Sequence, residues 1–205
     1  MPSQTFYRLK PQRRERLVEQ AFEVFSAGRY EDVSVRTLIV AMGLTTGSFY
    51  RYFVSKEELY IYLVDEMLVK FWSTLKAEPT TVLSHVPLEE IGLRVPSQSR
   101  FWHSFFASSA DIRQKYYFRV EGNALYARFY RSLERLPEAR RHSEEMVGFV
   151  AFLLNTLNFI ITAYREIRGL AYDDDVMFPE MRDMILSGFC AMAQRAEPKS
   201  KRTLP

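Results

Sequence analysis

Apolar residues recur at intervals of three and four along most of the chain, and this spacing predicts an all-α fold. The first long helix is expected to begin at Pro11. A backbone N–H at the first helical position has no partner within the helix, so proline, which has no N–H, loses nothing there. It should end within residues 26–30, which contain Gly28. The apolar face of this helix comprises Leu17, Val18, Ala21, Phe22, Val24 and Phe25.

Two short helices are expected next, on either side of Gly43. Ser34 and Thr45 each stand at the start of one of them, where a hydroxyl can accept from an otherwise unpaired backbone N–H. Gly43 suits the turn because glycine readily adopts positive φ. The pattern fits a helix-turn-helix, whose second helix enters the major groove of DNA. A plain helical hairpin inside a core has the same spacing, so both interpretations stay open at this point.

The rest of the chain is expected to form longer helices, interrupted by three prolines between residues 79 and 96. Ser55-Lys56-Glu57-Glu58 has the pattern of a capping box, in which a hydroxyl is followed by a carboxylate three residues later. The segments that we expect to be helical are 55–76, 111–135, 143–169 and the stretch that follows Asp173-Asp174-Asp175.

The last two long helices carry apolar residues that alternate four and three apart, which is typical of helix-packing seams. Phe149, Phe152 and Phe159 form a second apolar face on the first of these helices. A helix that is apolar on two faces is buried on both, here by its own core and by another subunit. We therefore predict a homodimer. The seam residues are Met146, Val150, Leu153, Leu157, Ile160, Met181, Met184 and Gly188.

Composition is ordinary for a soluble globular protein of one or two domains: 205 residues, 47% hydrophobic and 26% charged. Cys190 is the only cysteine, so no internal disulfide can form. The first residues have no secretory apolar segment, and no apolar run reaches membrane-spanning length without a polar break. We expect a cytoplasmic protein without a membrane partner.

The net charge of +3 is unevenly distributed. Residues 8–16 hold five Lys or Arg against Glu15 alone, and residues 195–205 hold four against Glu197 alone. A basic end suits a protein that approaches phosphate. For residues 197–205 we expect a solvated, disordered tail instead.

Candidate catalytic and metal chemistry is weak throughout the sequence. The three histidines, His85, His103 and His142, are not paired with another His or Cys at metal-ligand spacing. No phosphate-binding glycine loop and no nucleophile with an adjacent base is present. We therefore expect no enzyme, no metal and no cofactor.

A longer pattern extends over about the first third of the chain: Gly28-x-Tyr30-x-x-Val33-Ser34-Val35-Arg36-x-Leu38-Ile39-x-Ala41-x-Gly43-Leu44, followed by Gly47-Ser48-Phe49-Tyr50-x-Tyr52-Phe53-x-Ser55-Lys56-Glu57-Glu58-Leu59-Tyr60. This pattern resembles the DNA-binding domain of the TetR (tetracycline-repressor) family. The resemblance implies an N-terminal three-helix domain over residues 1–54, joined to a helical ligand-binding and dimerisation domain over 55–196.

The resemblance also implies which residues contact DNA. Phe49 and Phe53 are expected to pack inward and orient the reading helix. Thr46 stands where the family often has Lys or Arg, so Arg51 or the basic N-terminal residues would supply the missing charge. The expected DNA-binding residues are Ser34, Arg36, Thr45, Thr46, Gly47, Ser48, Tyr50, Arg51, Tyr52 and Lys56.

The aromatic middle of the chain has two interpretations, a packed core or an apolar pocket with a few polar groups. For a single aromatic residue the core is favoured, but the resemblance implies that a pocket exists. The residues expected to line it are Trp72, Trp102 and Phe105, with Glu121 and Asn155 as polar anchors.

These features together predict a transcriptional regulator. The expected mode is repression at a pseudo-palindromic operator, released by a small apolar or amphipathic effector through a shift between two dimer geometries. The alternative is a helical ligand-binding or protein-interaction module that has lost the ability to read DNA.

Overall fold

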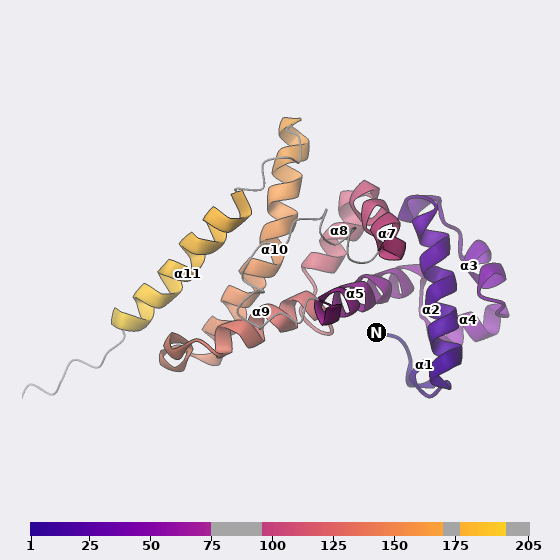
Figure 1. Ribbon diagram of the computed structural model, residues 1–205, viewed down its shortest axis with the longest axis horizontal. Coiled ribbons are helices and arrows are strands. Elements are labelled where there is room, and N and C mark those ends of the chain that lie inside the picture. Colours follow the sequence, from indigo (N-terminus) through magenta and orange to yellow (C-terminus); the bar gives the residue numbers. More distant parts are fainter. Residues whose placement is uncertain (75–95, 170–176, 196–205) are drawn as a thin grey trace, which may run out of the picture. The chain divides into compact units, whose positions relative to one another are not determined.

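The computed structural model describes residues 1–74, 96–169 and 177–195, and all regular secondary structure within these ranges is helical (Figure 1). The expected all-α fold is therefore confirmed. The expected tail and the acidic run at 173–175 lie outside the described residues. The elements are α1 Gln4–Tyr7, α2 Pro11–Ser26, η1 Tyr30–Asp32, α3 Val35–Ala41, α4 Thr46–Tyr52, α5 Lys56–Thr74, α7 Pro96–Ala107, α8 Ala110–Tyr117, α9 Ala124–Glu134, η3 Pro137–Arg141, α10 Glu144–Arg168 and α11 Met177–Arg195.

The described residues form two compact units, and the boundary lies at Ala124, the first residue of α9. The first unit contains α1 to α5 together with α7 and α8, and the second contains the remainder of α9 together with η3, α10 and α11. Helices α5, α7 and α8 thus pack with the helix-turn-helix. The boundary expected at residue 54 stays a prediction about where the DNA-binding domain ends.

Local sequence features predict the helix-turn-helix correctly. Pro11 occupies the first turn of α2. The Ser34 hydroxyl accepts from Thr37 N at 3.0 Å, and the Thr45 hydroxyl accepts from Ser48 N at 3.1 Å, so both are N-caps. Gly43 connects α3 and α4 with φ of 58°, a conformation that favours glycine.

The short helix α1 was not expected, and it completes the core of the first unit. Phe6 is fully buried, with its ring centroid 4.8 Å from Phe53 and 5.6 Å from Tyr62. Ser3 N donates to Tyr52 O at 2.9 Å, and the Ser3 hydroxyl donates to Arg51 O at 2.7 Å. The last carbonyls of a helix have no partner within it, so α1 caps the C-terminal end of α4.

Only half of the capping box expected at the start of α5 is present. Glu58 N donates to the Ser55 hydroxyl at 3.1 Å, as predicted. The Glu58 carboxylate accepts from Val54 N at 2.6 Å instead of from Ser55 N. Within the described residues α5 reaches Thr74, so the expected end at Lys76 is not described.

The single helix expected from about Asp111 to Arg135 is wrong. The chain turns at residues 118–123, between α8 and α9, and Gly122 has φ of 65°. Asn123 Nδ2 donates to Tyr116 O at 2.8 Å and thereby bonds a carbonyl at the end of α8. Apolar residues recur at helical spacing on both sides of the turn, so the sequence pattern predicted one continuous helix.

Asp65, on the buried face of α5, holds this turn in place. Its Oδ1 accepts from Ala124 N at 2.9 Å and from the Tyr116 hydroxyl at 3.3 Å, and its Oδ2 pairs with Arg119. Burial raises the pKa of Asp65 above its usual value, although Arg119 and the Ala124 amide act in the opposite direction. Asp65 therefore caps the first turn of α9 from another helix.

In the second unit, α11 packs against α10 and η3. The His142 ring lies 4.2 Å from the Phe189 ring, and its Nε2 lies 2.8 Å from Phe189 O. The segment Glu144–Ile161 of α10 is long and apolar enough to cross a membrane by length and composition. About half of it, 47%, is buried inside the protein. The core helix of a soluble protein passes the same test, so the finding is weak evidence for a membrane span.

The structure divides the predicted dimer seam between the inside and the outside of the second unit. Val150 and Leu157 are each only 4% exposed and face the unit's own core, so they cannot contact a partner, contrary to expectation. Ile160 (53% exposed), Met181, Met184 and Gly188 are exposed, whereas Met146 and Leu153 are half-buried. Phe149, expected on the other face, is exposed.

Replacing Asp65 with alanine should lower the free energy of unfolding by about 3 kcal/mol, because removing one partner leaves the part-buried Arg119 charge and the Tyr116 hydroxyl unpaired. Urea denaturation at pH 7 measures this change. Asp32→Ala is the control: it removes a carboxylate from an exposed pair with Arg29 and should leave stability nearly unchanged. Equal effects of the two substitutions would contradict the structural role of Asp65.

Candidate nucleic-acid interface

Helix α4 presents a small polar face to solvent and an aromatic face to the core. Thr45, Thr46, Gly47 and Arg51 are exposed, and Tyr50 is 52% exposed. The inward packing expected for Phe49 and Phe53 is confirmed, since both are fully buried. The exposed face is one that a major groove could accept.

Tyr52 lies on the buried face of α4, although it was expected to contact DNA. Its side chain is 8% exposed, and its ring centroid lies 6.0 Å from that of Phe6. The residue is two positions after Tyr50, which places it on a different side of the helix. Tyr52 therefore supports the reading helix from behind.

The two capping hydroxyls at the α3 and α4 N-termini are engaged in local hydrogen bonds. Thr45 Oγ1 donates to Ser48 Oγ at 2.9 Å, and the Ser34 and Thr37 hydroxyl oxygens lie 2.8 Å apart. Ser48 accepts this bond, so its own hydroxyl hydrogen can point to another acceptor. Arg36, on α3, is exposed and has no ion pair within the described part of the chain.

Lys56 is held inside its own unit. Its Nζ donates to Tyr30 O and to Val33 O, both at 2.8 Å, and lies 4.0 Å from the centre of the Tyr30 ring. Burial lowers the pKa of Lys56, while Glu31 and Asp32 act in the opposite direction. The Lys56 ammonium group, which was expected to contact phosphate, thus donates two of its three hydrogens to carbonyls of the loop before α3.

The same loop, residues 28–33, is also bonded by α7 and α8. The Ser104 hydroxyl donates to Gly28 O at 2.5 Å, and the Ser108 hydroxyl accepts from Tyr30 N at 2.9 Å. Ser109 N donates to Glu31 Oε1 at 3.0 Å, and this contact lowers the pKa of Glu31 against the opposing effect of burial. The loop that leads into the helix-turn-helix is therefore fastened from three helices.

The basic N-terminal residues remain largely accessible. Arg8, Lys10, Arg13 and Arg16 are exposed, whereas Arg14 is half-buried and its guanidinium donates to Tyr7 O at 3.3 Å. These side chains could supply the positive charge that Thr46 lacks on α4.

The residues expected to line an effector pocket belong to different units, and the pocket expected from them stays a prediction. Trp102 and Phe105 are buried in the first unit, with their rings stacked at a centroid distance of 5.5 Å. Asn155 is fully buried in the second unit. Glu121 is exposed because it lies in the turn between α8 and α9, not inside a helix. The side chain of Trp72 lies outside what the structure describes.

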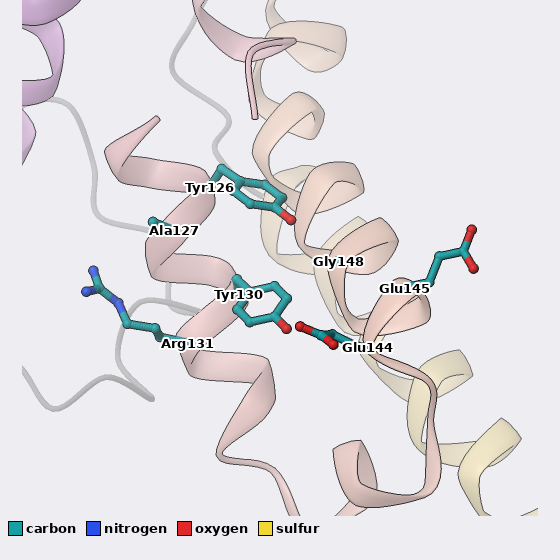
Figure 2. Close-up of a pocket in the computed structure, with 7 residues that line it drawn as sticks. All are labelled: Tyr126, Ala127, Tyr130, Arg131, Glu144, Glu145 and Gly148. Carbon is teal, nitrogen blue, oxygen red and sulfur yellow. The ribbon is translucent and has the colours of Figure 1, made fainter. Parts of the chain in front are cut away.

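A pocket of about 650 Å³ lies elsewhere, between α9 and α10 in the second unit (Figure 2). Sequence reasoning missed it, although Tyr126 and Tyr130 are four apart and Gly148 interrupts an otherwise bulky helix face. None of the five expected pocket residues lines it. Its lining comprises Tyr126, Ala127, Tyr130, Arg131, Glu144, Glu145 and Gly148.

Known proteins are similar to this chain, most specifically in its N-terminal region. Residues 17–63 match the family of bacterial regulatory proteins called tetR. The chain is also 29% identical over 166 residues to the HTH-type transcriptional regulator TcmR from Streptomyces glaucescens. That match covers 79% of this chain and 63% of the relative, so the chain spans less than two thirds of the relative's length. The family and the relative are regulators and not enzymes.

Solved structures of regulators are also similar. A TetR family transcriptional regulator from Chloroflexus aurantiacus J-10-FL is 20% identical, with a TM-score of 0.41, over 95% of this chain and 97% of that one. A transcriptional regulator from Aquifex aeolicus VF5 is 20% identical, with a TM-score of 0.39, over 87% and 98% of the two chains.

Replacing Lys56 with methionine should lower the free energy of unfolding by about 2 kcal/mol, because two carbonyls lose a charged donor. Thermal and urea denaturation measure this. Lys115→Met is the control, since it removes an exposed ammonium that pairs with Glu57 and Asp111, and it should leave stability nearly unchanged. Weaker DNA binding by Lys56→Met without any loss of stability would instead assign the Lys56 ammonium to a phosphate.

Proposed function

We propose that this protein, whose residues 17–63 match the tetR family of bacterial regulatory proteins, regulates transcription by binding a specific operator through α4. The observation that supports this most directly is the exposed polar face of α4, held by a capped start and a buried aromatic back. A position in the cytoplasm, where DNA is accessible, is part of the same proposal.

In this proposal α4 enters the major groove, as the second helix of a helix-turn-helix does. Thr46, Ser48 and Tyr50 offer hydroxyl groups to base edges or phosphates. At Gly47 an added Cβ would meet nothing within 4 Å, so the helix surface is open there for close approach of the duplex. Arg36, Arg51 and the exposed basic side chains before α2 contact phosphates, which fix position without reading sequence.

We propose further that the protein binds as a homodimer through the exposed apolar stripes of α10 and α11. On α10 the stripe comprises Phe149, Ile160, Tyr164 and Ile167, and on α11 it includes Met181, Met184 and Met192. Exposed apolar patches of this kind mark interaction sites. A two-fold dimer would recognise a pseudo-palindrome whose half-site centres lie about 34–36 Å apart, or a multiple of that.

Regulation in this proposal is repression released by a small apolar or amphipathic effector. An effector can shift the equilibrium between two dimer geometries only by the difference between its affinities for them. Couplings of about 1–3 kcal/mol are usual, which corresponds to roughly 5-fold to 150-fold changes in operator affinity.

Tyr50→Ala should weaken binding to an operator selected from a random DNA pool by about tenfold, with helical content unchanged, because Tyr50 is exposed and supports no core. Fluorescence anisotropy at several salt concentrations measures the affinity. The wild-type affinity should fall steeply with salt, as phosphate neutralisation requires. Val120→Ala, an exposed apolar change outside α4, is the control. No salt-dependent DNA binding by the wild type would favour a module that has lost DNA reading.

Ile160→Glu should raise the dimer dissociation constant at least about 100-fold, because a charge would be buried without a partner at the interface. Sedimentation velocity over a concentration series measures it. Val69→Glu places the same charge at an equally exposed apolar site on α5 and should leave the dimer intact. A dimer that withstands Ile160→Glu would rule out this face of α10.

A further inference from the structure

The pocket between α9 and α10 combines aromatic walls with one carboxylate. Tyr126 and Tyr130 lie on α9 with ring centroids 6.2 Å apart and an interplanar angle of 36°. Figure 2 shows the Tyr130 hydroxyl pointing toward the Glu144 carboxylate on α10. Two ring faces and a carboxylate that converge on one cavity are features of a site for a bound molecule.

Gly148 makes room for the tyrosines on this side of α10. A Cβ atom there would lie 3.3 Å from the Tyr126 hydroxyl oxygen and 3.9 Å from Tyr130 Cε2. A larger side chain at this position would push the rings away from α10 or fill the cavity. The volume of about 650 Å³ falls within the range of about 300–1,000 Å³ that small-molecule sites occupy.

The charge that faces the cavity is negative, although the protein as a whole carries +3. Glu144 has no ion pair with a Lys or Arg in the part of the chain that the structure describes. Figure 2 shows Arg131, the one cationic residue of the lining, extending away from the tyrosines, so it does not neutralise Glu144 across the cavity. Burial raises the pKa of Tyr130, and Glu144 raises it further, so the hydroxyl stays protonated and donates to that carboxylate.

The residues therefore select for charge as well as for shape. A cation gains from the negative ring faces of Tyr126 and Tyr130 and from the Glu144 carboxylate. An anion of the same shape would meet unfavourable potential from all three groups. Glu144 is exposed and its carboxylate is hydrated, so a neutral ligand would gain nothing from its charge.

We infer that the pocket between α9 and α10 binds an amphipathic organic cation, with Tyr126 and Tyr130 against its apolar part and Glu144 beside its charge. This cation is the effector of the proposed regulator, an assignment that rests on the proposed function. Glu144 and Glu145 both lie in the first turn of α10, where carboxylates also favour the helix N-terminus. Glu180 is an exposed carboxylate in the first turn of α11 and does not line the pocket, so it serves as a matched control for separating ligand binding from helix stability.

The first experiment is calorimetric titration of the full chain, without DNA, using tetraphenylphosphonium and its anionic counterpart of the same shape, tetraphenylborate, in sodium buffer. Tetraphenylphosphonium should bind more tightly, although the net positive charge of the protein favours the anion. Glu144→Gln should weaken tetraphenylphosphonium binding about threefold to tenfold and should not weaken tetraphenylborate binding. Glu180→Gln, which loses the same charge from the first turn of α11 outside the pocket, should change neither.

Equal affinities for the two ions, or equal effects of Glu144→Gln and Glu180→Gln, would overturn the assignment of a cation site. A second arm measures operator binding with and without tetraphenylphosphonium. The cation should weaken operator binding by the wild type and much less by Glu144→Gln. Cation binding without any change in operator affinity would refute the effector role, while the assignment of a cation site would still be supported. Absence of operator binding altogether would refute the proposed function, while the calorimetric titration would still test whether the pocket binds a cation.

Discussion

The reading helix depends on a short loop, residues 28–33, that is held by donors and acceptors from three other helices. Backbone groups removed from water need partners, and here Lys56 of α5, Ser104 of α7 and Ser108, which directly follows α7, supply them. The N–H of Ser109, at the N-cap of α8, donates to the Glu31 side chain of the same loop. Because α3 follows this loop directly, the orientation of the helix-turn-helix is set by α5, α7 and α8. The DNA-reading surface is thus an extension of a larger packed unit.

Features encoded within a few residues were predictable from the sequence. The N-caps Ser34 and Thr45, the positive φ at Gly43 and the proline at the start of α2 each involve one turn of chain, and all were found as expected. The inward position of Phe49 and Phe53 followed from the family resemblance. The intramolecular contacts of Lys56 and Tyr52 could not be predicted, because they come from the loop 28–33 and from α1, which are distant in sequence. The contact expected between Lys56 and phosphate stays a prediction.

Long-range packing explains the other differences. Apolar periodicity showed that α10 has two apolar faces, but not which one faces its own unit, so Val150 and Leu157 were placed on the wrong side. The break between α8 and α9 depends on Asp65, which is more than fifty residues away from the amide that it accepts from. The pocket arises where Gly148 meets two tyrosines of another helix, and neither helix alone encodes a cavity.

The docking of α1 has a consequence for the order of folding. Phe6 lies against Phe53 and Tyr62, and Ser3 bonds to the end of α4, so the N-terminal residues find their places only after some sixty residues are available. Contacts of large sequence separation form slowly because loop closure costs entropy before any contact is gained. During synthesis the Phe6 ring, which is buried in the folded protein, therefore stays exposed to solvent until α4 and α5 have left the ribosome.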